Sequence, residues 1–297
     1  MNRLIVIDGH AIMYRAFHAL PSFMTSKGEL VNAVYGFVSI ILRVISDLAP
    51  THLVVAFDTP KPTFRNKLYK DYQIQRPKMD DTLIPQIDRV HQVVWEMGIP
   101  VFEKDGFEAD DVIGTLVSNT CIDEAIIVTG DRDMLQLVNG KTKIYMPVKG
   151  LSVSKLFGEK EVVEKYGIKP SQFIDYKALV GDQSDNYPGV AGIGPKTAVT
   201  LIVKFDTLEK LYKNVDKLEN ENIRNKLVEN EKLALVSKKL ATILTDVPIK
   251  MEMEKCKLPN LDKPNIHHLF EELEFRSLIS RLSSNNRQKI TDNIKHK

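Results

Sequence analysis

Short apolar runs that end in a carboxylate recur along this chain and constrain its fold more than any other feature. The runs with their acids are residues 4–7 with Asp8, residues 53–57 with Asp58, and residues 125–130 with Asp131. Runs of this length are typical of buried strands in a parallel sheet, whose two faces are both covered by helices. The carboxyl ends of parallel strands lie at one edge of the sheet, where ligands bind in open α/β folds. We therefore expect acids that are far apart in the sequence to converge on one crevice.

Further acids stand in short clusters and complete a set of nine candidate metal ligands. They are Glu108, Asp110, Asp111, Asp133, Asp182 and Asp185. Two like charges about 4 Å apart repel by roughly 4 kcal/mol at an effective dielectric near 20, so cations or protons must neutralise such a set. Oxygen ligands without Cys or His favour hard ions, which predicts two or more Mg²⁺ ions, with Mn²⁺ as a substitute. Interaction with a helix dipole is an alternative reason for Asp110 or Asp111 alone.

A pair of such ions activates an attacking water and stabilises the leaving oxygen in phosphoryl displacement, so the predicted chemistry is phosphodiester hydrolysis. The chain has 41 Lys and Arg against 39 Asp and Glu, and nine of those acids belong to the predicted site. The remaining surface therefore carries an excess of basic residues, which suits contact with a nucleic-acid backbone. No apolar run approaches a signal or membrane-spanning segment, so we expect a cytoplasmic protein without membrane association.

Residues 189–198, Gly-Val-Ala-Gly-Ile-Gly-Pro-Lys-Thr-Ala, precede an apolar helical pattern and look like a helix-hairpin-helix element. Gly192 and Gly194 permit a tight turn, and Pro195 suits the first position of a helix. Exposed amides at that helix start, with Lys196 nearby, can hold a DNA phosphate. Pro195 between Gly194 and Lys196 excludes a nucleotide-binding P-loop. An ordinary glycine turn before a helix is the alternative for this motif taken alone.

Basic and aromatic side chains alternate between Asp58 and the next predicted helix. They are Lys61, Phe64, Arg65, Lys67, Tyr69, Lys70, Tyr72, Arg76 and Lys78. Such a segment can steer a single nucleic-acid strand and stack its bases. A solvated charged helix is the alternative, because nearby aspartates dilute the positive field.

The order of the expected elements predicts an α/β fold, in which helices flank a mostly parallel sheet. We expect helices at 33–45, 83–97 and 109–117, strands at 53–57, near Val101 and at 125–129, and mainly helices after residue 160. Amphipathic stretches at 207–212 and 230–244 belong to this helical part. The segment from 283 onward is polar and has no periodic apolar face, so we expect disorder there.

Together these residues resemble the 5′-nuclease domain of bacterial DNA polymerase I, within the flap endonuclease family. The matching stretches are residues 6–9, 14–19, 55–58, 108–116, 129–134, 181–186 and 189–198, and the resemblance covers Leu4 to Leu282. It implies a PIN-like nuclease core in residues 1–170 with a helical arch around 61–90, and a helix-hairpin-helix DNA-binding domain in 171–282. The implied activity is removal of 5′ flaps and RNA primers, with cleavage of flapped, nicked or RNA-primed DNA near the junction of single and double strands.

The resemblance also implies roles for single residues. One metal group would comprise Asp8, Asp58, Glu108, Asp110 and Asp111, and a second would comprise Asp131, Asp133, Asp182 and Asp185. Catalytic residues in the arch would be Arg65, Tyr72 and Arg76. Contacts to DNA would come from Arg15, Gly189, Gly192, Ile193, Gly194, Lys196 and Thr197, and K⁺ would bind at the hairpin.

Gln73 departs from the family pattern, which has a lysine immediately after the tyrosine that matches Tyr72. Lys70 lies three residues earlier and would share a helix face with position 73, so we hypothesise that Lys70 supplies the missing charge as a catalytic residue. No polymerase or proofreading sequence follows, which predicts a stand-alone monomer that acts beside a separate DNA polymerase and ligase.

Two other classes of protein are alternatives. A non-catalytic protein that binds flaps or junctions could keep the DNA surface, but this chain retains all nine acids. A small-molecule phosphatase on a similar sheet is disfavoured, because Asp8-Gly9-His10 lacks the Asp-x-Asp pair of the haloacid-dehalogenase type and such an enzyme needs no hairpin motif.

Overall fold

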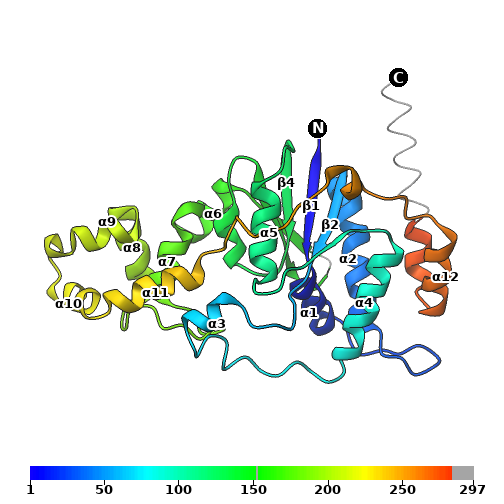
Figure 1. Cartoon of the computed structure of the whole chain (residues 1–297), viewed down its shortest axis with the longest axis horizontal. Helices are drawn as coiled ribbons and strands as arrows, with labels where there is room; N and C mark the ends of the chain where they lie inside the picture. The colour runs from blue at the N-terminus through cyan, green and yellow to red at the C-terminus, as the bar shows by residue number, and fades with distance from the viewer. Residues whose placement is uncertain (152, 283–297) are drawn as a thin grey trace.

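A six-stranded sheet in the order β3-β2-β1-β4-β5-β6 lies at the centre of the computed structural model, which describes residues 1–151 and 153–282 (Figure 1). The strands are β1 (Arg3–Asp8), β2 (His52–Ala56), β3 (Val101–Phe102), β4 (Glu124–Val128), β5 (Thr142–Lys149) and β6 (Val153–Phe157). Strands β1 to β5 run parallel, and only β6 pairs antiparallel with its neighbour β5. The predicted mostly parallel sheet is confirmed. The tail predicted to be disordered, 283–297, lies outside the described residues.

The helices fall into an early set around the sheet and a later, nearly continuous set. The α-helices are α1 (Gly9–Ala19), α2 (Asn32–Leu48), α3 (Phe64–Leu68), α4 (Ile84–Glu96), α5 (Ala109–Ser118), α6 (Glu159–Tyr166), α7 (Phe173–Val180), α8 (Pro195–Phe205), α9 (Leu208–Lys213), α10 (Glu221–Glu229), α11 (Glu231–Ala241) and α12 (Pro264–Glu272). Short 3₁₀ turns are η1 (Asp133–Leu137), η2 (Pro170–Gln172), η3 (Val215–Lys217) and η4 (Met253–Cys256). Within the described residues, no helix is both long and apolar enough to span a membrane.

Alternation along β1 explains the two layers that cover the sheet. Leu4 and Val6 point to the face packed by α5, whereas Ile5 and Ile7 point to the face packed by α1, α2 and α4. All four side chains are fully buried. Because successive strand residues face opposite sides, an uninterrupted apolar run is what a strand between two helical layers requires.

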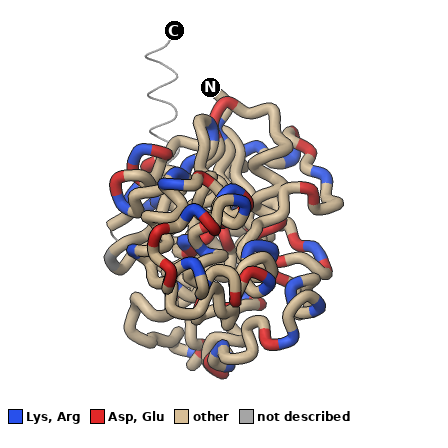
Figure 2. The backbone as a smooth tube through the Cα atoms, turned by 90° about the vertical axis from the view of Figure 1, so that its left-hand side faces the viewer, with Lys and Arg blue, Asp and Glu red and all other residues tan. Residues whose placement is uncertain are grey.

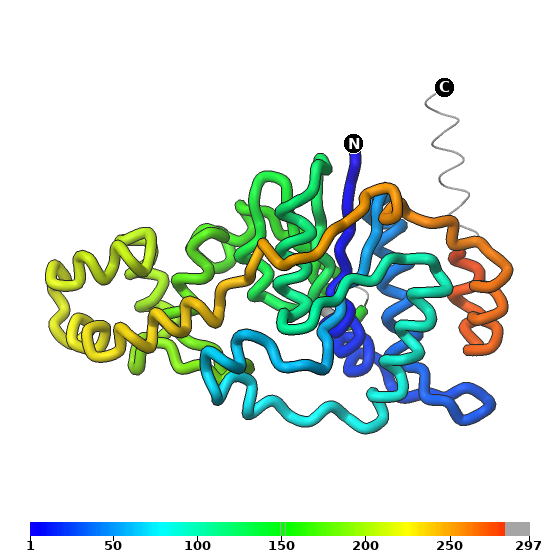
Figure 3. Tube along the Cα trace, in the orientation of Figure 1, coloured from blue at the N-terminus to red at the C-terminus, as the bar shows by residue number. Residues whose placement is uncertain are grey.

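Helices α7 to α11 form a helical lobe (residues 173–241) that extends from one end of the sheet (Figures 1 and 3). Helix α7 packs against α8 and α11 in this lobe. Its core includes Leu179, Ala198, Leu201 and Ala234, and it is continuous with the core on the α5 face of the sheet.

The chain then returns from the lobe to the sheet, as the orange segment of Figure 3 shows. Val247 N donates to Thr115 Oγ1 on α5 (3.1 Å), and Leu258 N donates to Thr51 O before β2 (2.8 Å). Helix α12 packs beside α4, and its Phe270 is fully buried on the α2 face. The apolar side chains after residue 258 thus complete the core of the sheet, and the predicted domain boundary at 171–282 stays a prediction.

The predicted helical arch around 61–90 contains only one short helix, α3, before α4 begins. Residues 69–83 are turns and irregular backbone. Gln73 has a left-handed φ of 58°, which interrupts any helix through this position. Lys70 and Gln73 therefore do not share a helix face, and that part of the hypothesis about Lys70 is wrong.

Candidate metal centre and nucleic-acid groove

The strand-end acids meet at the carboxyl edge of the sheet, as expected. Asp8 ends β1 and caps α1, since its Oδ1 accepts a hydrogen bond from Ala11 N (3.0 Å). Its Oδ2 accepts a hydrogen bond from Thr129 Oγ1, which follows β4 (2.6 Å). Asp58 follows β2, and its Oδ1 accepts from Ala109 N at the start of α5 (2.7 Å). These bonds bring the ends of three strands and one helix together.

We call Asp8, Asp58, Glu108 and Asp110 the inner acid group. Burial raises the pKa of Asp8 and of Glu108 to about 7, and it raises the pKa of Asp110 well above its usual value. The charges of the neighbouring carboxylates add to each rise. In residues 1–151 and 153–282, Asp8, Asp58 and Asp110 form no ion pair with Lys or Arg. The group therefore has more negative charge than its surroundings compensate.

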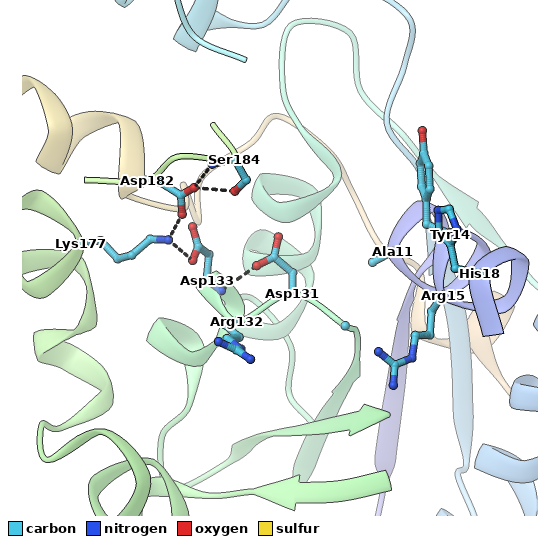
Figure 4. Close-up of a pocket in the computed structure, with 11 residues that line it drawn as sticks. Ala11, Tyr14, Arg15, His18, Asp131, Arg132, Asp133, Lys177, Asp182 and Ser184 are labelled. Atoms are coloured by element: carbon cyan, nitrogen blue, oxygen red, sulfur yellow. Dashed lines mark hydrogen bonds and ion pairs between the residues drawn. The ribbon is translucent and has the colours of Figure 1, made fainter. Parts of the chain in front are cut away.

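We call Asp131, Asp133, Asp182 and Asp185 the outer acid group. Lys177 on α7 lies between two of its members, with Nζ 2.7 Å from Asp133 Oδ1 and in direct contact with Asp182 Oδ2 (Figure 4). Burial raises the pKa of Asp133 to about 7 in spite of this ammonium. Against the effect of burial, Lys177 and the hydroxyl of Ser184 hold the pKa of Asp182 below its usual value.

Asp111 has a different environment from the other eight acids. Its Oδ2 accepts from Arg65 Nη1 (2.6 Å) and Glu108 N (3.1 Å), and its Oδ1 accepts from Arg65 Nη2 (2.9 Å) and Leu244 N (2.9 Å). Both side chains are buried, at 0% exposure for Asp111 and 2% for Arg65. Four hydrogen bonds occupy the lone pairs of this carboxylate. Asp111 and Arg65 thus pair with each other in this structure, and their assignments as a metal ligand and a catalytic residue stay predictions.

Residues 69–76, here called the docked segment, lie against the acids. Tyr72 Oη donates to Glu108 Oε2 (3.2 Å), and Arg76 Nη2 donates to Asp185 Oδ1 (2.9 Å). Gln73 also donates to Asp185, through its backbone N to the main-chain O (2.9 Å) and through Nε2 to Oδ1 (3.1 Å). Lys70 is exposed and has no ion pair with an acid in the described part of the chain. In this structure Lys177 and Arg76 contact the outer acid group and Lys70 does not, so the catalytic role of Lys70 stays a prediction.

An open groove of about 650 Å³ runs beside the outer acid group. Its lining residues come from α1, the loop after β4, α7 and the loop after α7; they are Ala11, Tyr14, Arg15, His18, Gly130, Asp131, Arg132, Asp133, Lys177, Asp182 and Ser184. Figure 4 shows the guanidinium groups of Arg15 and Arg132 on the same side of the acids. Basic groups next to acids allow a phosphate to approach a site that would otherwise repel it.

The predicted hairpin forms a turn that leads into α8. Gly192 has a φ of +75°, and Gly194 precedes Pro195 at the first position of the helix. Gly192, Gly194 and Lys196 are exposed, whereas the side chain of Ile193 is only 5% exposed. Gly189 is likewise buried, and an added Cβ there would lie 2.3 Å from Gly181 N.

Gly189 and the side chain of Ile193 thus support the turn from inside, and the predicted DNA contacts of these two residues stay predictions. Thr197 is half-buried on the first turn of α8. Figure 2 looks onto the helical lobe and shows basic and acidic residues interspersed over this end. Any phosphate contact here depends on local amides and Lys196 more than on a broad basic face.

The donor set fits hydrated divalent ions bound by few carboxylates each. Among residues 1–151 and 153–282, no three Asp, Glu, His or Cys side chains are close enough to enclose one ion. Mg²⁺ usually keeps several waters and binds through one or two carboxylates, so wider spacing suits it. Burial and the neighbouring carboxylates raise the pKa values of Asp8, Glu108 and Asp110, which is an environment that a cation would relieve. All donors are oxygens, which suits the same class of ion.

Sequence reasoning missed Lys177, Arg132 and the contact of Gln73 with Asp185. A signal for Lys177 exists, because it is the one basic residue in the otherwise mainly apolar stretch Phe-Ile-Asp-Tyr-Lys-Ala-Leu-Val of α7. Its partners could not be named, since Asp133 lies 44 positions earlier and meets it only in the fold. Arg132 stands between two predicted ligands and carried no signal of its own.

Two family models match adjoining parts of the chain. The model described as "5′-3′ exonuclease, N-terminal resolvase-like domain" matches residues 3–167, and "5′-3′ exonuclease, C-terminal SAM fold" matches residues 168–264. DNA polymerase I of Caldicellulosiruptor bescii is 42% identical over 285 residues, which cover 94% of this chain and 33% of the relative. The chain thus spans about a third of the length of the curated relatives that it matches.

Solved structures share the fold at lower sequence identity. A bacteriophage T5 flap endonuclease in complex with DNA and metal ions has a TM-score of 0.68 at 21% identity, covering 82% of this chain and 90% of that one. The catalytic core of Rad2 in complex with DNA substrate has a TM-score of 0.63 at 17% identity, covering 96% and 92%.

Proposed function

The chain belongs to the 5′-3′ exonuclease family, and from this membership we propose that it is a structure-specific 5′-3′ exonuclease and flap endonuclease. Its substrates are DNA with 5′ flaps or nicks and RNA-primed DNA, and its reaction hydrolyses a phosphodiester bond to leave a 5′-phosphate. The observation that carries the proposal is the convergence of eight carboxylates, in the inner and outer acid groups, beside a groove with basic walls. Such a concentration of buried carboxylates is typical of a functional site, and here it suits one that binds cations and a phosphate.

The two acid groups are proposed to hold at least two Mg²⁺ ions, with Mn²⁺ as a substitute. When bound, the ions would supply an activated water and stabilise the leaving oxygen. Asp8, Asp58, Glu108 and Asp110 would hold one ion, partly through water, and Asp131, Asp133, Asp182 and Asp185 the other. Arg65 and Asp111 hold α3 against α5 and thereby keep Glu108 and Asp110 in place.

The DNA is proposed to contact the protein at two places. Arg15 and Arg132 on the groove wall would bind backbone phosphates next to the acids. At the hairpin, the amides at the start of α8, Lys196 and Thr197 would hold a phosphate of the duplex, with K⁺ bound there. Tyr72 and Arg76, which already contact the acids, would act on the strand being cut.

We propose that the protein acts in the cytoplasm as a monomer, together with DNA polymerase and ligase activities that fill and seal the gap that it leaves. Residues up to about 170 would carry most of the chemistry, and the loop after α7 would add Asp182 and Asp185 to it. The helical lobe would carry duplex binding. The division between the two family models at residues 167 and 168 supports this arrangement.

The proposal is tested with a 5′-labelled duplex that carries a single-stranded 5′ flap. The protein should release the flap near its junction with Mg²⁺ and not with chelator, and Asp131→Asn should remove this cleavage. Asp246→Asn is the matched control, because Asp246 is an exposed acid away from the groove. Flap binding without cleavage would instead support a junction-binding protein, and a 5′-hydroxyl product would contradict the chemistry.

A further inference from the structure

Gln73 has a backbone conformation that side chains other than glycine rarely adopt. Its φ is +58°, and Asn186, which lies across the contact with the docked segment, has a φ of +54°. Strained residues of this kind persist only where surrounding contacts fix them, and they concentrate at functional sites. Here the fixing contacts are Gln73 N to Asp185 O (2.9 Å) and Asn186 Nδ2 to Asp71 O (2.7 Å).

The side chain of Gln73 acts on the same residue as its backbone. Its Nε2 donates to Asp185 Oδ1 (3.1 Å), and Arg76 Nη2 donates to that oxygen as well (2.9 Å). The other oxygen, Asp185 Oδ2, has only a long contact from Tyr72 Oη (3.4 Å). One oxygen of Asp185 is thus held by the docked segment, and the other is left weakly bonded.

The charge on Asp185 matters to both acid groups, since it raises the pKa of Glu108 and of Asp131. A carboxamide orients a carboxylate without cancelling its charge, whereas an ammonium at the same position would form an ion pair. Hydrogen-bond partners behind a metal ligand fix its orientation, and their loss typically costs 10–100-fold in metal affinity or activity. Arg76 is 55% exposed, so solvent screens much of its charge.

We propose that Gln73 is a positioning residue that orients Asp185 as a ligand for a divalent ion in the outer acid group, through donors that leave the negative charge of Asp185 intact. The inference rests on the proposed function only in requiring that a divalent ion bind at the outer acid group. It assigns Gln73 a role in ion binding that does not require contact with DNA.

The test is a titration of the whole chain with Mn²⁺ alone, in which electron paramagnetic resonance measures free Mn²⁺. We expect the outer acid group, which already holds Lys177, to be the lower-affinity site. Gln73→Ala should weaken Mn²⁺ binding at this site about tenfold and leave the higher-affinity site unchanged. Gln73→Lys should weaken the same site, because the ammonium would pair with Asp185. Gln75→Ala is the matched control, since Gln75 is an exposed glutamine two residues away with no hydrogen bond to an acid in the described structure.

A double-variant cycle separates positioning from a general structural effect. In an Asp185→Asn background, Gln73→Ala should cause no further loss of Mn²⁺ affinity, whereas a general effect would persist there. Unchanged Mn²⁺ affinity in Gln73→Ala, or binding of a single ion by the wild-type chain, would overturn the inference. The measured Mn²⁺ affinity does not depend on cleavage. A chain that binds two ions and cuts no flap would therefore contradict the proposed function, and the Mn²⁺ affinity of Gln73→Ala would still test the role of Gln73.

Discussion

The inner and outer acid groups are both rich in carboxylates, but the protein balances their charge differently. Asp8, Asp58 and Asp110 have no Lys or Arg at ion-pair distance in the part of the chain that the structure describes, and burial raises the pKa of Asp8 to about 7. In the outer group, Lys177 bridges Asp133 and Asp182, and Arg76 contacts Asp185. Lys and Arg side chains thus contact three of the four acids of the outer group, all but Asp131, whereas among the described residues of the inner group only Glu108 has such a neighbour, Arg65.

This difference predicts two unequal ion sites. An ion at the inner group displaces protons and relieves repulsion that amounts to roughly 4 kcal/mol for two charges about 4 Å apart at a dielectric near 20. An ion at the outer group must also displace or share carboxylates with the ammonium of Lys177. We therefore expect the inner group to bind its ion more tightly above neutral pH, and the outer group to fill at higher concentration.

The largest expected effect is loss of cleavage when the inner group is weakened. Asp110→Asn should lower the single-turnover cleavage rate by more than about 100-fold, which exceeds the range for losing a residue behind a metal ligand. Asp185→Asn should weaken ion binding at the outer group, which already has the lower affinity. Its effect on the cleavage rate should therefore become smaller as the Mn²⁺ concentration is raised. Equal losses at every Mn²⁺ concentration would break the comparison. Retained flap binding in a filter assay shows that either variant is folded.

A smaller effect is expected at the ammonium in the outer group. Lys177→Met should raise the Mn²⁺ affinity of the weaker site about tenfold, which corresponds to about 1.4 kcal/mol. Without metal, the same variant should melt at a lower temperature, because Asp133 and Asp182 would lose their buried partner. Thermal unfolding with and without Mn²⁺ measures both changes. Lys160→Met is the control, since Lys160 is 84% exposed, and a fall in affinity for Lys177→Met would contradict the competition.

The pH dependence of stability should differ by a few degrees in melting temperature between the acids with raised pKa values, which include Asp133 of the outer group, and Asp182, whose pKa is lowered. Asp8 and Glu108 have folded pKa values of about 7, above their ordinary values of 3.8 and 4.5. The folded chain then binds more protons, so their contribution is present at low pH and is lost as pH rises through about 7. Asp182, with a lowered pKa, contributes the opposite way and loses its stabilisation only as pH falls below its usual range.

Melting in chelator from about pH 5 to about pH 8 should therefore show a decline that Asp8→Asn reduces and Mg²⁺ reverses. Asp182→Asn should leave that decline in place. A wild-type curve that rises over this interval without metal would mean that the inner acids are not protonated in the folded protein.

The smallest effect is expected at Lys70. Lys70→Ala should change single-turnover cleavage by no more than about twofold, as is usual for exposed residues without specific contacts. Arg76→Ala in the same segment should have a larger effect, because Arg76 contacts Asp185. A large loss for Lys70→Ala would show that the docked segment rearranges when DNA binds and would restore the original hypothesis.

The sheet and the acids on it could be predicted from sequence because their signals are local. Strands β1, β2 and β4 are uninterrupted apolar runs, and each is followed by an acid whose position at the sheet edge follows from parallel topology. Strands β5 and β6 were not predicted. β5 contains a proline and a register shift near Pro147, and most of β6 is exposed, so neither gives a clean period.

The pairing of charges could not be predicted, because it depends on contacts between distant segments. Asp111 and Glu108 both look like metal ligands in the sequence. In the fold, Arg65 forms a short ion pair with Asp111, 46 positions away, and only a longer one with Glu108. The docked segment has the composition of an arch helix, but its contacts with Asp185 and Asn186 hold Gln73 in a left-handed conformation. Local propensity does not include such contacts.

The return of the chain from the helical lobe has a mechanical consequence. Two separate stretches of backbone connect the lobe to the sheet, one entering α7 and one leaving α11, and Leu244 N and Val247 N bond the second stretch to α5. Two connections restrict rotation and translation of the lobe relative to the sheet more than a single linker would. If the hairpin binds the duplex as proposed, these two connections would limit changes in its distance from the acids, and that distance would determine how far from the bound duplex the backbone is cut.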